Sequence, residues 1–337
     1  ASGEQSFGER PAHSSTRTRP HARLALDMAE NMRVPDGRAG TRTDLARLHM
    51  RAGNVAEGAE LACSAAELWA TLGHDAERAM SFRVAAYCRS LHWAVASALE
   101  ASHEAETLAE RGQAVLWWPA IVAESARTRW LLGAAAAALS ELDRADSLVR
   151  SAGLPEAANV FVRYLRAIVL IDSGEITAGR EQLDALRDED LQAPFIAGVP
   201  LGSIVELCMA RVALHEGDVD NARRHLDQVA PRIQQVTEEL DTTWFDAPML
   251  LGSTAVAAGN LAVAQWAAEV MLDHARRREI RLLEPEGMWV KGMVMQARNE
   301  PEPARKLLSE ARRMATAMGS SRPPGGSAEL VTSARSD

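Results

Sequence analysis

The feature that most constrains the fold of this chain is a turn that recurs seven times at nearly even spacing. The turn positions are Gly53, His92, Gly133, Gly174, Gly217, Gly259 and Asn299. Successive turns are 39, 41, 41, 43, 42 and 40 residues apart, and a glycine follows twenty residues later at Gly73, Gly112, Gly153 and Gly319. A fixed period in this range is typical of helical repeat arrays, in which no unit can bury its apolar face alone.

Two further columns of the repeat support helix pairs around each turn. Seven residues before the turns stand Ala46, Ala85, Ala126, Ala167, Ala210, Gly252 and Gly292, and five residues after them stand Gly58, Ser97, Ala138, Gly179, Ala222, Ala264 and Ala304. All are small, and two antiparallel helices approach closely only where small side chains meet. The pattern therefore predicts helix–turn–helix units.

Several units have a small residue, then a Gly-Asp or Gly-Asn turn, then a second small residue. This order resembles the tetratricopeptide pattern. The clearest copies run over 214–222 (LHEGDVDNA) and 257–264 (AAGNLAVA). The standard tetratricopeptide unit has about 34 residues, so the units here are longer. The longer variety resembles the C-terminal arms of large bacterial ATP-binding regulators, including those that end in a LuxR-type DNA-binding domain.

The repeat pattern sets the expected domain organisation. We expect an all-α, right-handed α-solenoid at 21–319, with about seven tetratricopeptide-like repeats of about 41 residues. Residues 22–33 are expected to form a preceding half repeat. The composition of 1–20 and 320–337, rich in Ser, Arg, Pro and Gly, predicts disordered tails. A half repeat and a first residue other than Met indicate a fragment of something longer.

Composition and motifs exclude several classes of function. The net charge of −9 argues against nonspecific nucleic-acid binding. No phosphate-binding loop, dinucleotide motif or HExxH sequence is present, so the sequence predicts no catalytic residue, cofactor or metal. Three isolated cysteines suit a reducing compartment. Since the sequence also has no secretion signal and no apolar run of membrane-spanning length, we expect a cytoplasmic protein that does not bind membranes.

The candidate binding residues follow from the family geometry, in which the first helix of each pair lines the concave groove. The groove is expected to be basic through Arg47, Arg83, Arg89, Arg127 and Arg211, and apolar around Phe161 and Tyr164. Spaced guanidinium groups suit the carboxylates of an acidic or C-terminal peptide. The competing interpretation pairs these arginines with acidic residues of the helices themselves, such as Asp44 or Glu124.

Aromatic residues beside proline form a second candidate surface. Trp117 and Trp118 precede Pro119, and Trp244 and Phe245 precede Pro248, at matching places in two repeats. If exposed, these aromatic residues would form hot spots for a partner. The alternative is that they pack beneath the neighbouring helix.

The sequence thus favours a non-enzymatic protein-interaction or scaffold domain, and the resemblance implies that it is the arm of a bacterial signalling or transcriptional regulator. One alternative is a sensor that holds a small effector inside the superhelix. A more distant alternative is an α/α-barrel hydrolase that uses Asp241 and Asp246 beside Trp244. The identity of the partner and the oligomeric state are not encoded in these patterns.

Overall fold

The computed structural model describes residues 24, 28, 35–154, 160–187, 194–196, 199–239 and 246–326, and the described chain is a stack of helix pairs. The helices are α2 (Pro35–Arg51), α3 (Val55–Leu72), α4 (Asp75–Leu91), α5 (Val95–Arg111), α6 (Trp118–Leu131), α7 (Ala135–Ser151), α8 (Val160–Asp172), α9 (Ile176–Arg187), α10 (Leu201–His215), α11 (Val219–Glu239), α12 (Asp246–Ala258), α13 (Leu261–Arg278), α14 (Leu283–Ala297) and α15 (Pro301–Ala317). A short antiparallel strand pair, β1 (Pro194–Ile196) and β2 (Val199–Pro200), lies between α9 and α10.

The predicted α-solenoid is confirmed, and each predicted turn joins the two helices of one pair. Five of the seven turn positions are glycines, all with φ between 75° and 85°, and Asn299 has φ 62°. Glycine suits these turns because it adopts positive φ without the steric cost that a Cβ adds. Seven helix pairs, from α2–α3 to α14–α15, are therefore present in the described part of the chain.

In the second pair the turn lies one residue later than the sequence pattern indicated. The residue with positive φ is Trp93 (66°), while His92 is in the right-handed helical region. The next break shifts in the same way, from Gly112 (φ −80°) to Gln113 (φ 49°). Glycine is the usual marker of such positions, so the periodicity read from glycines missed two turns that use other residues.

The small-residue columns lie where the paired helices touch. Ala46 and Ala138 are completely buried. A Cβ added to Gly58 would be 3.1 Å from Cys88 Sγ and 3.3 Å from the Ala46 carbonyl oxygen, and one added to Gly179 would be 2.7 Å from Ile171. Close packing of this kind leaves no room for another methyl group, which explains the residue choice.

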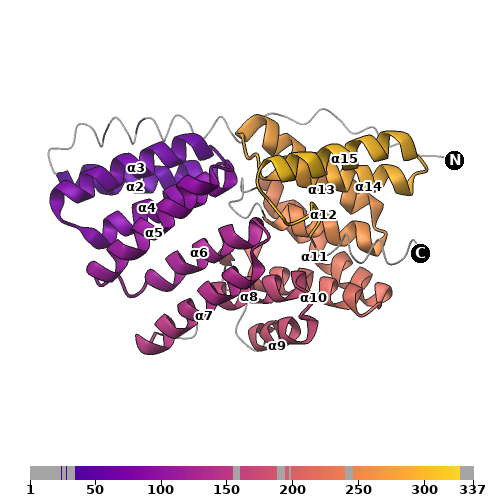
Figure 1. Cartoon of the computed structure of the whole chain (residues 1–337), viewed down its shortest axis with the longest axis horizontal. Coiled ribbons are helices and arrows are strands. Elements are labelled where there is room, and N and C mark those ends of the chain that lie inside the picture. The colour runs from indigo at the N-terminus through magenta and orange to yellow at the C-terminus, as the bar shows by residue number, and fades with distance from the viewer. Residues whose placement is uncertain are drawn as a thin grey trace.

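The first helices of the pairs line the inner side of a curved array (Figure 1). They contact one another in succession from α2 to α14, whereas α7 and α9 lie on the outer side of the bend. The inner helices α6 and α12 are buried nearly all round, including Glu124, Arg127 and Asp246. An amphipathic surface helix would bury only one stripe, so both helices lie in the interior of the array.

The curvature brings the N-terminal and C-terminal parts of the array into contact (Figure 1). The Leu282 amide donates to the Leu91 carbonyl oxygen at 3.3 Å, and His92 Nδ1 lies 3.2 Å from the Glu279 carbonyl oxygen. The Trp93 indole donates to the Met318 carbonyl oxygen at 2.5 Å. Nothing in the repeat pattern demanded this closure, because it depends on side chains about 190 to 225 residues apart.

The C-terminal boundary of the array lies beyond the predicted one. Residues 320–326, assigned by sequence to a disordered tail, fold back from α15 onto α6 and α14. The Ser321 amide donates to the Leu132 carbonyl oxygen at 2.9 Å, and the Gly325 amide donates to Glu286 Oε2 at 2.6 Å. The predicted N-terminal tail at 1–20 and the rest of the C-terminal tail lie outside the described residues, as does the half repeat apart from Leu24 and Met28.

None of the helices in the described ranges combines the length and the apolar character needed to cross a lipid bilayer.

The non-glycine turns predict a simple stability effect. Gln113 is exposed with φ 49°, so Gln113→Gly should raise the free energy of unfolding by about 0.5–1 kcal/mol through relief of left-handed strain. The matched control is Gly153→Ala, where φ is 61° and an added Cβ meets nothing within 4 Å. That change should lower the free energy by about 1 kcal/mol. Urea unfolding followed by circular dichroism measures both, and a destabilised Gln113→Gly would contradict the explanation.

Candidate binding site on the inner face

A buried ion pair crosses the inner face between the middle and the C-terminal part of the array. Arg127 on α6 donates from Nε and Nη2 to the two carboxylate oxygens of Asp246 on α12, at 2.8 and 2.6 Å. Nη1 donates to Ser90 on α4 at 3.2 Å, and the guanidinium lies 4.8 Å from the centre of the Tyr87 ring. Arg127 is 2% exposed. One guanidinium therefore joins three first helices.

Glu124 is a second carboxylate of this group, and burial disfavours its charged form. It is buried one helical turn from Arg127, whose Nη1 lies 3.4 Å from Glu124 Oε1. Burial raises the pKa of Glu124, although Arg127 and Arg83 act in the opposite direction. Burial likewise lowers the pKa of Arg83, a partly buried residue whose Nη1 lies 3.8 Å from Met80 Sδ. The charged forms of both groups are thus disfavoured by desolvation.

Asp172, at the end of α8, is a second centre of the inner face. Its Oδ2 accepts a hydrogen bond from the Trp130 indole at 2.9 Å, and its Oδ1 accepts one from Arg211 on α10. Arg211 also donates to Ser253 and Thr254 on α12. Arg322, from the segment after α15, places Nε 3.5 Å from Asp172 Oδ2. The carboxylate thus links three first helices to the folded-back segment.

Glu286 on α14 completes the contacts of that segment. Its Oε1 accepts a hydrogen bond from Arg322 Nη1 at 2.5 Å, and its Oε2 accepts the Gly325 amide at 2.6 Å. The Arg322 guanidinium also lies 5.1 Å from the centre of the Trp130 ring. Burial opposes the charge on Arg322, but Glu286 and Asp172 more than offset it and raise its pKa. Arg322 is therefore held as a cation between two carboxylates and an aromatic ring.

The residues after Arg322 form a tight turn against α14. Pro324, Gly325 and Gly326 are buried, and the Gly326 amide donates to the Pro323 carbonyl oxygen at 2.9 Å. Gly325 has φ 84°, and an added Cβ would be only 2.6 Å from the Trp289 ring. We call residues 320–326 the C-terminal strap. Because proline fixes part of its backbone and glycine allows the turn, the strap is largely preorganised.

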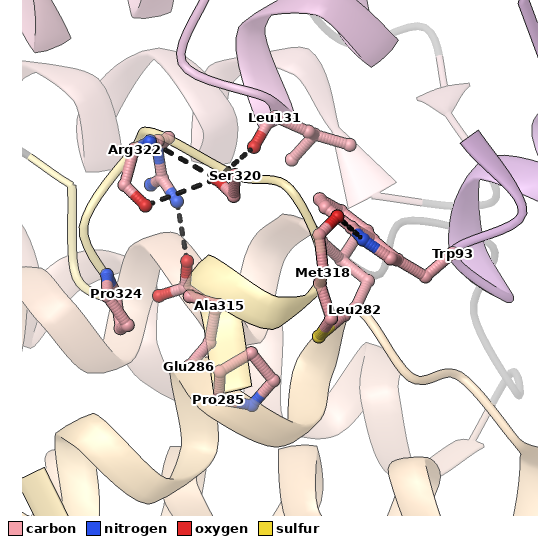
Figure 2. A pocket seen from close by; sticks show the side chains of 10 residues that line it. All are labelled: Trp93, Leu131, Leu282, Pro285, Glu286, Ala315, Met318, Ser320, Arg322 and Pro324. Atoms are coloured by element: carbon pink, nitrogen blue, oxygen red, sulfur yellow. Dashed lines mark hydrogen bonds and ion pairs between the residues drawn. The ribbon is translucent and has the colours of Figure 1, made fainter. Parts of the chain in front are cut away.

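A small cleft runs beside the strap (Figure 2). Its wall includes Trp93, Leu131, Leu282, Met318 and Arg322, and its cavity volume is only about 20 Å³. Small-molecule sites usually enclose roughly 300–1,000 Å³ and are mostly closed. The cleft therefore does not resemble the enclosed effector pocket that the sensor alternative required.

The structure brings some of the expected arginines together and separates others. Arg127 and Arg211 lie on the inner face, but both are buried in ion pairs, as the competing interpretation held. Arg47 lies 3.4 Å from Asp44 at the partly exposed N-terminal side. Arg89 instead donates to the Ser97 carbonyl oxygen and to Cys63 Sγ, both at 3.1 Å, so it lies toward α3 and α5.

The displaced turn of the second pair explains the position of Arg89. In the third pair the residues six and three positions before the turn at Gly133 are Arg127 and Trp130, and both lie on the inner face. Counted back from Trp93, the same positions in the second pair are Tyr87 and Ser90. These two residues contact Arg127. A one-residue error rotates a helix by about 100°, which is enough to exchange inner and outer side chains.

Among the described apolar and aromatic candidates, some are buried in the core and one is exposed. Tyr164 is 2% exposed and Phe161 is partly buried, and both pack in the main core. Trp118 packs between two core clusters, whereas Trp117 is 46% exposed. Trp244 and Phe245 lie outside the described residues, as does Asp241. Asp246, the described member of the proposed hydrolase pair, has both oxygens bound to Arg127.

Sequence reasoning missed the residues that define the strap site: Asp172, Glu286, Trp289 and Arg322. Trp130 stands three residues before a turn, so the family geometry did place it on the inner face. The acidic residues carry no such signal, because Asp172 lies two residues before its turn and Glu286 lies near the start of its helix.

The remaining reactive groups are ordinary core residues. Cys63, Cys88 and Cys208 are free thiols, and burial raises the pKa of Cys208 to about 12. A thiol with so high a pKa is unreactive. Within the described ranges no cluster of His, Cys, Asp and Glu has the arrangement of a metal site.

Comparison with known proteins supports the fold. No protein-family model matches the sequence, and no curated protein matches it. Among solved structures, the Rap conjugation gene regulator of the plasmid pLS20, in complex with the Phr* peptide, matches 94% of this chain and 80% of its own. The TM-score is 0.62 at 10% sequence identity. The chain therefore has a tetratricopeptide-like array of the kind seen in that regulator.

Arg127 provides a test of the inner-face network. Arg127→Met leaves Asp246 buried without its bidentate partner, so the free energy of unfolding should fall by about 3–5 kcal/mol. The double change Arg127→Met with Asp246→Leu removes both charges and should recover most of the loss. Chemical denaturation of the full chain measures these values. Arg47→Met, in an exposed pair, is the control and should cost no more than about 1 kcal/mol; an equally small loss at Arg127 would contradict the network.

Glu124 predicts a pH dependence. Because its folded-state pKa is raised above 4.5, its contribution to stability is present below that value and is lost as the pH rises through the folded pKa. Relative to Glu124→Gln, the native chain should lose free energy of unfolding from about pH 4.5 upward. Denaturation of both proteins across this range gives the difference. If the native chain instead gained stability relative to Glu124→Gln toward neutral pH, the pKa of Glu124 would be lowered in the folded state, and the prediction would be wrong.

Proposed function

We propose that this chain is a non-enzymatic interaction domain that binds a non-helical peptide segment on its inner face. One observation carries the proposal: the inner face holds a non-helical segment, residues 320–326, through side chains of α6, α8 and α14. Helical solenoids use the concave surface that their curvature creates for binding, and a few buried anchors supply most of the energy at such interfaces. The strap shows that this surface accommodates a segment of that kind.

The charge of the site favours a basic partner over the acidic one that the sequence suggested. Arg127 and Arg211 are occupied by Asp246 and Asp172. The side chains that contact the strap are instead carboxylates and tryptophans. Arginine suits such a surface, because its planar guanidinium can stack on an aromatic ring and at the same time donate hydrogen bonds to carboxylates.

The wider biological setting extends the same proposal. The Rap regulator of similar fold was solved with a bound peptide, which supports a peptide partner here. We further propose that the chain is part of a bacterial signalling or transcriptional regulator that acts in the cytoplasm. The resemblance to regulator arms and the three free cysteines support this setting.

A peptide-selection experiment tests the function. The full-length chain with residues 320–326 replaced by glycine and serine exposes the inner face and is used to select binders from a random peptide library. We expect enrichment of a shared sequence, and the enriched peptide should bind the unmodified chain at least about 10-fold more weakly, because the strap occupies the site. If the exposed chain stays folded and enriches no sequence, the interaction function is wrong.

A further inference from the structure

We propose that Asp172, Glu286, Trp130 and Trp289 form a recognition site for a peptide that has the pattern Arg-x-x-Gly and makes a tight turn at its glycine, and that the C-terminal strap is its internal, displaceable occupant. This inference rests on the proposed peptide-binding function and specifies its ligand. In the structure, Arg322 and Gly325 occupy the two specified positions, separated by two prolines.

The arginine position is defined by three contacts from three helices. Glu286 on α14 binds Nη1 at 2.5 Å, Asp172 on α8 lies 3.5 Å from Nε, and the Trp130 ring on α6 lies 5.1 Å from the guanidinium carbon. A lysine ammonium is a compact point charge on a flexible stem and cannot satisfy this planar arrangement. The site therefore discriminates between the two basic side chains.

The glycine position is defined by Trp289 and Glu286. The amide of Gly325 donates to Glu286 Oε2 at 2.6 Å, so the same carboxylate anchors both positions. The backbone has φ 84°, and a Cβ would lie 2.6 Å from the Trp289 ring. Any side chain at this position would both strain the backbone and collide with the tryptophan. Glycine three residues after arginine is thus a second requirement.

Without a bound segment, Glu286 lacks hydrogen-bond partners from the rest of the described chain, and this favours binding of a segment that supplies them. Glu286 is 5% exposed, and in the described part of the chain its hydrogen bonds go to Arg322 and Gly325. Removal of the strap would take both of these hydrogen-bond partners from the carboxylate, and water would have to replace a charge-assisted pair. Asp172, by contrast, keeps Trp130 and Arg211. A second guanidinium is therefore the ligand that the empty site best accommodates.

The strap is attached by few other groups, so a partner can displace it. Ser320 and Ser321 bond to the Leu131 and Leu132 carbonyl oxygens. Ser321 and Pro323 are exposed. Because the strap is tethered, its effective concentration is on the order of millimolar. A competing peptide must reach that concentration or make further contacts on the inner face, which sets a threshold for binding.

A direct binding experiment uses the peptide with the sequence of residues 320–326, carrying a fluorescent label. Its affinity is measured by fluorescence anisotropy for the full-length chain and for the full-length chain with residues 320–326 replaced by glycine and serine. We expect at least about 10-fold tighter binding to the substituted chain. Replacement of arginine by alanine in the peptide should weaken binding at least about 10-fold, and alanine in place of the glycine corresponding to Gly325 should do the same. A lysine peptide should bind more weakly than the arginine peptide.

Controls separate the ligand assignment from the general function. Asp172 also stabilises the array, so the site is tested through Glu286→Gln in the substituted chain, and thermal unfolding shows whether each protein remains folded. If the alanine peptide binds the folded substituted chain as well as the arginine peptide, peptide binding stands and the arginine assignment is overturned. If no peptide binds it, and library selection also fails, both proposals fall.

A measurement on the unmodified chain avoids any question of misfolding. Excess unlabelled peptide should increase hydrogen exchange in residues 320–326 several-fold, because the displaced strap loses its protection. The alanine peptide at the same concentration is the matched control and should leave exchange unchanged. Equal exchange with and without the arginine peptide, at concentrations that saturate the unmodified chain in the anisotropy measurement, would overturn displacement.

Discussion

The inner face of this array depends on the need to pair charges that are buried away from water. Within the described residues, three guanidinium groups and four carboxylates share this interior: Arg127, Arg211, Arg322, Glu124, Asp172, Asp246 and Glu286. An uncompensated buried charge costs several kcal/mol, on the order of a large part of a protein's net stability. The partners come from α6, α8, α10, α12, α14 and the strap, so their pairing fixes how the first helices lie relative to one another. Curvature and site are thus consequences of the same electrostatic requirement.

The sequence predicted the repeats well because turns and close helix contacts leave local signals. Glycine at positive φ marks most of the turns, and small residues mark where helices meet. The exception is instructive: Trp93 and Gln113 adopt positive φ without being glycine, and the resulting one-residue error placed Arg89 on the wrong side of α4. Local patterns therefore define the fold to within about one residue, and an inner-face assignment needs better than that.

The binding site was beyond such reasoning because its contacts join residues far apart in the chain. Arg127 and Asp246 are separated by 119 residues, and Glu286 and Arg322 by 36. The proline- and glycine-rich composition of 320–326 resembles that of a disordered tail, but prolines and glycines also suit a preorganised turn. A preorganised turn differs from a disordered tail here because Glu286 and Trp289 contact Gly325. These contacts are known only from the folded array.

The proposed peptide site requires that the strap occupies the inner face in solution. Hydrogen exchange of the Gly325 amide in the unmodified chain measures this, since that amide is bonded to Glu286 Oε2. The proposal predicts exchange slowed by on the order of 100-fold relative to an unstructured peptide, with protection lost in Arg322→Ala. Exchange at the rate of an unstructured peptide in the unmodified chain would contradict it.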